Sequence, residues 1–330
     1  MPELRYNLVS GDWVVVATER AKRPKDFLKA KEKKELPAYK DNCPFCPGNE
    51  KLTPQETYRL GDEKSWKVRS VFNLYGALSP SAERGRKLEG INLSMGGFGT
   101  AEVLIEHPQH NICIPLMKDE EVENIIRMYK ERYVAMTRTE GVEAVIIFKN
   151  HGPMAGTSLE HPHSQLIATP IVPPQIRGRV DKAVHYFDMT GQCIFCKTLE
   201  EELKAKKRIV VETDKFVSFL PYAGPSPFTI WIFPRRHLAY FGHVSDEEMK
   251  DLAVNLKSTL QKLYYGLDNP DYNYMIRSIP TKERGTEYFH WYLSIIPRMT
   301  QPAGFELGSG MFINTSLAEE AAEFLRQIKC

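Results

Sequence analysis

The chain has 330 residues, of which 42% are hydrophobic and 26% charged, the proportions of a globular protein with a sizeable core. The formal net charge of +2 is too small for a surface that coats nucleic acid or follows an anionic membrane. No apolar run approaches the ~18 residues that span a bilayer, and the first residues contain no apolar signal core. We therefore expect a cytoplasmic protein.

The cysteines suggest metal binding. Four of the six form two CxxC pairs, Cys43 with Cys46 and Cys193 with Cys196. In a reducing compartment such pairs are more often metal ligands or redox pairs than structural disulfides. Chance is the alternative for either pair taken alone, so the residues that follow each pair decide the interpretation.

A fixed order of elements follows the first pair. Residues 101–107 predict a strand that a proline ends, and His110 comes just after it. Residues 118–138 have apolar side chains at helical spacing and acids in the first turn, which predicts a helix. Residues 143–148 predict a buried strand, and a glycine-containing turn leads to a strand that contains residues 161–163.

The same order follows the second pair. Residues 227–233 predict a strand ended by a proline, and His237 comes just after it. A helix is expected next, with Ser245 as its N-cap and Glu248 completing a capping box. Two strands joined by a turn close the unit, and His290 lies in the second of them.

The histidine spacing repeats as well, which predicts an internal duplication. His161 follows His110 by 51 residues, and His290 follows His237 by 53. Each copy offers two cysteines and two histidines, the donor set that tetrahedral Zn(II) favours. The predicted ligands are Cys43, Cys46, His110 and His161 in the first site and Cys193, Cys196, His237 and His290 in the second.

Four protein ligands close a zinc site, so both metals are expected to be structural. His107 is the alternative to His110 in the first site. We prefer His110 because it lies just past a proline, as His237 does in the second copy.

One histidine is left over beside the first site. In an extended strand His161 and His163 share a face. The preceding loop carries glycines and hydroxyl groups, which can turn N–H and O–H groups toward an anion. An imidazole beside a bound phosphate can act as a nucleophile or as a general acid/base. The alternative is that His163 is a partly buried histidine that takes no part in a reaction.

The motifs CPFCPGNE, IEHPQH, FKNHGPMAGTSLEHPHSQ and FHWYLSIIPR together resemble the galactose-1-phosphate uridylyltransferase family. That family belongs to the histidine-triad superfamily, with ADP-glucose phosphorylases and dinucleoside tetraphosphate phosphorylases as relatives. The resemblance extends over nearly the whole chain. It implies an α+β fold of two tandem histidine-triad-like halves, residues 1–172 and 173–330, each with a mostly antiparallel sheet, a long helix and a Cys2His2 zinc site.

The resemblance implies a ping-pong nucleotidyl transfer. In such enzymes the second histidine of the HPH motif, here His163, attacks the α-phosphorus of a nucleoside diphosphate sugar and holds the nucleotide covalently. A second sugar 1-phosphate then takes the nucleotide. UDP-glucose and galactose 1-phosphate are the expected substrates, and the alternative is an ADP-glucose phosphorylase, in which inorganic phosphate is the acceptor. A homodimer, with partner residues near the phosphates, is also implied.

Single residues acquire roles from the same resemblance. Gln165 matches the glutamine that hydrogen-bonds the phosphoryl group, and strand alternation puts it on the face of His163. The alternative for Gln165 is an ordinary polar strand residue. The alternative for Arg20 and Arg23 is a solvated basic stretch, and that for Glu306 is an exposed loop glutamate. Matches to phosphate and nucleotide contacts are Arg20, Arg23, Asn73, Asn150, Gly156, Thr157 and Ser158, and matches to hexose contacts are Phe305 and Glu306.

The second copy differs at the nucleophile. His290 is kept, but Tyr292 stands where the first copy has the second histidine, so only the first half is expected to form an adduct. Ser164 follows the HPH motif where well-known uridylyltransferases carry glycine, as in several prokaryotic relatives and ADP-glucose phosphorylases, which leaves the sugar open. The base is open too, because nothing in the sequence separates uracil from adenine recognition. Some relatives hold iron in the second half, but the full Cys2His2 set predicts zinc here.

Two other classes of function give different expectations. A zinc-stapled binding module would carry a basic stripe with interleaved aromatics, whereas the charges here are mixed. A nucleotide hydrolase would turn over with water alone. Between the halves, residues 171–192 predict a packed helical connector, and residues 79–90 predict a mobile surface loop.

Overall fold

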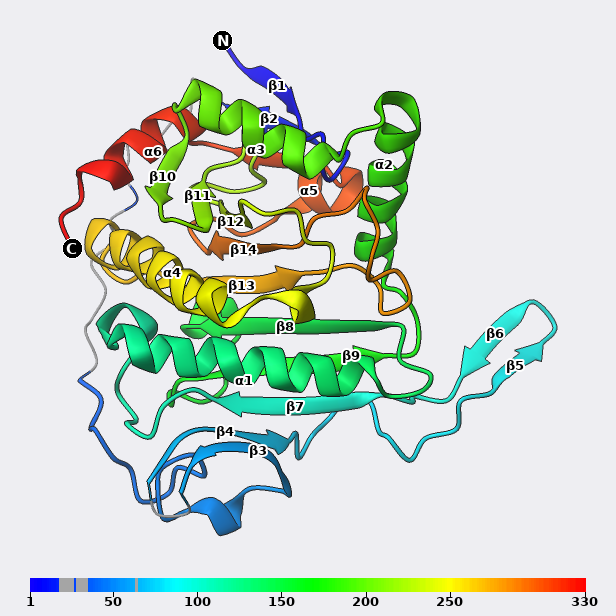
Figure 1. Ribbon diagram of the computed structural model, residues 1–330, viewed down its shortest axis with the longest axis vertical. Helices are drawn as coiled ribbons and strands as arrows, with labels where there is room; N and C mark the ends of the chain where they lie inside the picture. Colours follow the sequence, from blue (N-terminus) through cyan, green and yellow to red (C-terminus); the bar gives the residue numbers. More distant parts are fainter. Residues whose placement is uncertain (18–26, 28–34, 63–64) are drawn as a thin grey trace.

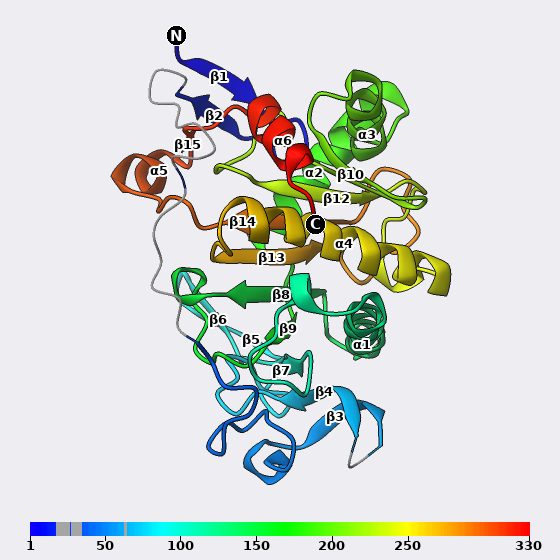
Figure 2. The same ribbon diagram turned by 90° about the vertical axis from the view of Figure 1, so that its left-hand side faces the viewer.

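The computed structural model describes residues 1–17, 27, 35–62 and 65–330. A ten-stranded sheet forms its centre, in the order β10-β11-β12-β14-β13-β8-β9-β7-β4-β3, and every pairing in it is antiparallel. Two long helices, α1 (Asp119–Thr137) and α4 (Asp246–Gly266), lie side by side on one face of this sheet (Figures 1 and 2).

Each half contributes five strands and one of these helices in the same order. The strands of the first half are β3 (Glu56–Gly61), β4 (Trp66–Phe72), β7 (Thr100–Ile105), β8 (Ala144–His151) and β9 (His163–Thr169). Those of the second half are β10 (Ile209–Glu212), β11 (Phe216–Phe219), β12 (Ile230–Pro234), β13 (Tyr272–Arg277) and β14 (Tyr292–Pro297). From edge to centre, β3-β4-β7-β9-β8 mirrors β10-β11-β12-β14-β13, with the helix between the third and fourth strands in chain order. The topology thus repeats as the sequence predicts.

The two halves join through β8 and β13 at the middle of the sheet. Their register pairs Tyr272 with His151 and Asn273 with Asn150. One hydrophobic core cluster contains residues of both long helices and both sets of strands, including Ile125, Ile147 and Leu256. The halves therefore share one sheet and one core.

The helix starts differ between the halves. At α4 the Glu248 N–H donates to Ser245 Oγ at 3.2 Å, and the Ser245 N–H donates to Glu248 Oε2 at 2.8 Å, which confirms the predicted capping box. At α1 the Lys118 N–H donates to Glu121 Oε2 at 2.7 Å, but Lys118 makes no side-chain cap hydrogen bond.

The chain ends lie together in a second, smaller sheet. Strands β1 (Glu3–Tyr6) and β2 (Trp13–Val16) are antiparallel, and β15 (Phe312–Asn314) pairs with β2 in parallel. Arg5 Nη1 lies 3.0 Å from Glu319 Oε2 on helix α6 (Ala318–Gln327), which ties the first strand to the last helix. The N-terminal strands thus pack with the C-terminal end of the chain.

The remaining helices surround the second half (Figure 1). The connector forms α2 (Pro174–Thr190), as predicted, and α3 (Ile194–Ala205) and α5 (Gly304–Ser309) follow. Within the described ranges, no helix combines the length and the apolar character needed to cross a membrane.

Two expectations about local structure are wrong. Residues 79–90 are not simply a loop, because β5 (Arg86–Glu89) pairs with β6 (Asn92–Met95) in a hairpin that projects from the body (Figure 1). His161 and His290 also lie outside strands, since β9 and β14 begin two residues after them. Pro162, which follows His161, has no N–H for a sheet ladder.

Candidate active site

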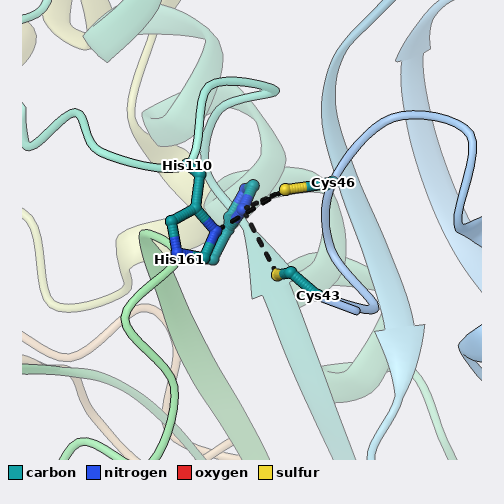
Figure 3. A group of neighbouring side chains, drawn as sticks. All are labelled: Cys43, Cys46, His110 and His161. Atoms are coloured by element: carbon teal, nitrogen blue, oxygen red, sulfur yellow. Dashed lines mark hydrogen bonds between the residues drawn. The ribbon is translucent and has the colours of Figure 1, made fainter. Parts of the chain in front are cut away.

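The four predicted ligands of the first zinc site form one buried group, shown in Figure 3. Cys46 Sγ lies 3.5 Å from His110 Nδ1 and 3.7 Å from His161 Nδ1, and Cys43 Sγ lies 3.7 Å from His161 Nδ1. Zn–S and Zn–N bonds of about 2.3 and 2.0 Å give tetrahedral S···N edges of about 3.5 Å. The group therefore fits zinc in size and in donor chemistry.

Hydrogen bonds around this group orient the histidine rings and so decide which nitrogen faces a metal. The Nε2–H of His161 donates to the His107 carbonyl at 2.7 Å, which leaves Nδ1 for a metal. The ring of His107 instead accepts from the Gln109 N–H at 2.9 Å. The structure thus places His110, not its rival His107, beside the cysteines.

The second group is more open. Cys193, Cys196 and His237 bring their donor atoms within 4.8 Å of one another, and His290 Nδ1 lies 3.3 Å from Cys196 Sγ. His237 is exposed, and a cavity of about 460 Å³ borders it, lined also by Lys197. All eight predicted ligands therefore gather in two groups that could bind zinc.

His163 lies at the first residue of β9, directly after the first metal group. Its Nδ1–H donates to the His161 carbonyl at 2.8 Å, so Nε2 keeps its lone pair. Burial lowers the pKa of His163, which favours the neutral imidazole. The ring of Phe45, between the two cysteines, packs 5.5 Å from that of His163 and 6.0 Å from that of His161. The metal loop and the free imidazole are thus in direct contact.

A buried polar network lies under this strand. Lys149 Nζ donates to the His163 carbonyl at 3.1 Å and pairs with Glu106. Glu106 also accepts from Tyr129 at 2.8 Å and from Ser164. Burial alone would raise the pKa of Glu106, but the Lys149 ammonium holds it below its usual range. Ser164 therefore belongs to the interior and not to the face that carries His163.

The loop after β8 folds back on Asn150. Thr157 Oγ1 donates to the Asn150 carbonyl at 2.6 Å. Gly156 has φ +84°, the left-handed conformation that glycine adopts without strain. Gly152 has the same φ, and a Cβ there would lie 2.3 Å from Asp271 Cγ. The glycines thus allow the sharp turn and its close approach to the second half.

Two residues of the second half hold this loop, and sequence reasoning missed both. Asp271 Oδ2 accepts from the Met154 N–H at 2.6 Å. Asn273 Nδ2 donates to Asn150 Oδ1 at 2.8 Å and to the Ala155 carbonyl at 2.9 Å. Because Asn273 takes up the oxygen of the Asn150 amide, the amide nitrogen is left to donate elsewhere.

The other predicted nucleotide contacts lie on or near the same strands. Gln165 is two residues after His163 in β9, so it shares the face of His163. Asn73 follows β4, and its Oδ1 accepts from the Tyr75 N–H at 3.0 Å. Ser158 is exposed in the loop. Arg20 and Arg23 lie outside the described residues.

The predicted hexose contacts lie on α5. Phe305 is 48% exposed, and Glu306 Oε2 accepts from the Ala303 N–H at 2.9 Å, so the carboxylate caps its own helix. Gln301, just before this helix, has its Nε2 3.9 Å from Met154 Sδ in the glycine loop. The segment before α5 therefore reaches the candidate site.

Comparison with known proteins adds a family and several relatives. Residues 1–173 match the family model of the galactose-1-phosphate uridyl transferase N-terminal domain, and residues 179–329 match that of the C-terminal domain. ADP-glucose phosphorylase of Arabidopsis thaliana is 38% identical, covering 99% of this chain and 93% of the relative. Galactose-1-phosphate uridylyltransferase of Thermotoga maritima is 28% identical, covering 99% and 98%. The crystal structure of an Arabidopsis thaliana ADP-glucose phosphorylase with bound ADP-glucose gives a TM-score of 0.85 at 34% identity, covering 100% of this chain and 99% of that one.

Proposed function

Since the chain belongs to the galactose-1-phosphate uridylyltransferase family, we propose that it transfers a nucleotide through a covalent adduct on His163. Nε2 attacks the α-phosphorus of a nucleoside diphosphate sugar, and the sugar 1-phosphate leaves. In the second step an oxygen of the acceptor phosphate attacks the same phosphorus, and the imidazole leaves. The observation that carries the proposal is the Nδ1–H bond to the His161 carbonyl, because it leaves the Nε2 lone pair available.

The neighbouring residues supply binding. A neutral buried imidazole beside polar side chains and a glycine loop suits a phosphate ester that must be held while its phosphorus is attacked. Asn150 supports this role most directly, since Asn273 orients its amide nitrogen to donate. In the proposal, the phosphates are bound by Gln165, Asn150, Gly156, Thr157 and Ser158. The nucleotide and its charge are bound by Asn73, Arg20 and Arg23, and the sugar is bound by Phe305 and Glu306.

We propose ADP-glucose as the donor and inorganic phosphate as the acceptor. The 38% identity to an ADP-glucose phosphorylase over nearly the full length supports this choice. The second candidate is transfer from UDP-glucose to galactose 1-phosphate, which the family models and the 28% identical uridylyltransferase support. The relatives thus reverse the order in which the motifs alone rank the two substrates.

The metals and the assembly complete the proposal. When bound, zinc would hold the chain at the two Cys2His2 groups and take no part in the transfer. The matching strand orders support two histidine-triad-like halves, residues 1–172 and 173–330. Exposed Leu88, Ile91 and Leu93 on the projecting hairpin support a homodimer, because apolar patches of this kind commonly mark protein interfaces.

Intact mass spectrometry after incubation with ADP-glucose or UDP-glucose tests the proposal. We expect one adduct per chain, whose mass identifies the base, and its loss on addition of phosphate with release of the nucleoside diphosphate. His163→Gln should form none, whereas His185→Gln, a change at an exposed histidine of α2, should behave as the wild type. Turnover with water alone, or an adduct that persists in His163→Gln, would overturn the mechanism.

A further inference from the structure

The start of β14 corresponds to the start of β9. His163 opens β9 and Tyr292 opens β14, each two residues after a predicted zinc ligand. Continued two residues past the pair of Phe148 with Gln165, the register of β8 and β9 brings Asn150 level with His163. The register of β13 and β14 pairs Arg277 with Tyr292. In the second half, Tyr292 therefore takes the place of the nucleophile and Arg277 takes the place of Asn150.

A second arginine reaches this position from the connecting helix. Arg179 of α2 donates from Nε to Tyr292 Oη at 3.2 Å, and from Nη1 to the Gln175 carbonyl at 2.7 Å. Arg277 Nη1 donates weakly to Gln175 Oε1 at 3.4 Å, and its buried Nε has no partner. Within the described part of the chain, no carboxylate pairs with either guanidinium.

This arrangement gathers positive charge without a neighbouring carboxylate among the described residues. Burial, together with the positive charge of Arg179, lowers the pKa of Arg277 to about 10, so the Arg277 guanidinium remains charged at neutral pH. The Arg277 side chain is partly buried, and charges withdrawn from water are ordinarily paired, because desolvation without a partner is costly. Tyr292 accepts from Arg179, so its own O–H remains a donor. Arg179, Arg277 and Tyr292 can thus all donate hydrogens, and the two arginines add positive charge.

We propose that Arg179, Arg277 and Tyr292 form a second anion site, which binds a phosphoryl dianion (inorganic phosphate or a phosphate monoester) without transferring it. The planar guanidinium matches two oxygens of such a group, and charge-assisted bonds of this kind are strong. No imidazole stands at this position, so nothing there can form a phosphoramidate adduct. The second half has kept a place for the ligand and lost the nucleophile.

Crystals soaked in sodium tungstate, an anomalous scatterer shaped like phosphate, locate the ion directly. We expect a peak in contact with both guanidinium groups. Calorimetric titration with inorganic phosphate, without any sugar nucleotide, should then show one more bound phosphate per chain in the wild type than in Arg277→Met. If Arg277→Met fails to fold, Arg179→Met provides the same test, because Arg179 lies at a half-buried surface position. We expect Arg179→Met to bind phosphate at this site at least about tenfold more weakly than the wild type.

Controls separate this site from the candidate active site. Arg235→Met removes a surface arginine that pairs with Glu212 and should keep the wild-type phosphate count. His163→Gln should keep this site as well, so failure of the transfer mechanism would leave the result intact. The proposal is overturned if tungstate avoids both arginines, or if Arg277→Met and Arg179→Met both bind as many phosphate ions as the wild type.

Discussion

The interiors beneath the two equivalent strand starts differ in chemistry. Under His163 lie the ion pair of Glu106 with Lys149 and the hydroxyl of Ser164. The strand registers place three apolar residues at the same positions of the second half, namely Pro234, Ile276 and Leu293. One fold thus accommodates either a charged or an apolar core at the same place in its sheet.

This difference indicates that the charges of Glu106 and Lys149 contribute more to the candidate active site than to the stability of the fold. A buried ion pair seldom stabilises a protein more than the apolar residues that could replace it. The second half shows that this fold tolerates such residues here. In the first half, Lys149 also donates to the His163 carbonyl, so the pair holds the backbone that presents the imidazole. We therefore regard Lys149 as a positioning residue for His163.

Removing one charge should produce the largest effect. Lys149→Met leaves the Glu106 carboxylate buried without its partner and should cost about 3–5 kcal/mol in the free energy of unfolding, measured with urea. Ile276→Met, at the equivalent position, should change it by less than about 1 kcal/mol. The double variant Lys149→Met/Glu106→Gln should regain most of the stability, yet form the His163 adduct at least about tenfold more slowly in a single turnover. Adduct formation at the wild-type rate in the double variant would show that the pair only fills space.

The same ion pair predicts that the contribution of Glu106 to stability changes with pH in opposite directions in the wild type and in Lys149→Met. The pKa of Glu106 lies below its usual range in the folded wild type, so the pair stabilises the fold above the ordinary carboxyl pKa, and this contribution is lost as pH falls through the folded value. In Lys149→Met the ammonium is gone, and burial, opposed only by the hydrogen bonds from Ser164 and Tyr129, raises that pKa. The stability difference between variant and wild type should therefore shrink on acidification. A difference that stays constant with pH would refute the assignment.

A change at Asn273, where β13 of the second half pairs with β8 of the first, should have the next largest effect, a loss of activity. In Asn273→Asp the carboxylate can no longer donate to Asn150, whose amide should turn its nitrogen inward and its oxygen toward the proposed phosphate site. We expect kcat/KM to fall about 10–100-fold, or about 1.4–2.8 kcal/mol. Met275→Leu, on the same face of β13, is the matched control and should stay within about twofold. Equal activity of both variants would show that the orientation of Asn150 is unimportant.

The two Cys/His groups, loaded with zinc as proposed, should differ in how fast they release it. The first is buried, whereas the second has an exposed histidine beside a cavity of about 460 Å³. A chromogenic chelator should remove one zinc per chain at least about tenfold faster than the other, since it can reach the second group without local unfolding. Cys196→Ser should eliminate the fast phase and Cys46→Ser the slow one. The reverse assignment would contradict the comparison.

The smallest effect concerns the two helix starts. Ser245→Ala removes the side-chain acceptor at α4 and should cost about 1 kcal/mol of unfolding free energy. Lys118→Ser supplies such an acceptor at α1 and should add about 0.5 kcal/mol. Urea denaturation monitored by circular dichroism measures both. A loss of stability in Lys118→Ser would mean that the lysine side chain makes a contribution of its own.

Local patterns were enough to predict most of the elements and the two Cys/His groups that could hold a metal. The capping box of α4 and the repeated order of strands depend on residues close in sequence. The CxxC pairs followed by histidines at matched spacing predict the two groups that could bind a metal. The roles of Asp271, Asn273 and Lys149 could not be predicted, because they depend on which strands become neighbours in the sheet. A hydrogen bond such as that from Asn273 to Asn150 crosses 123 residues of chain. Pairing at that distance is set by packing and leaves no local pattern.

The bond between β8 and β13 also bears on how this protein can be divided. Cutting the chain between residues 172 and 173 would give two fragments, each with one bare strand edge, because β8 and β13 would lose each other while keeping β9 and β14. Such edges invite aggregation, so neither fragment is a good candidate for separate expression. Produced together, however, the fragments carry complementary edges and matching core surfaces, which makes this junction a natural position for a split enzyme whose activity reports reassembly.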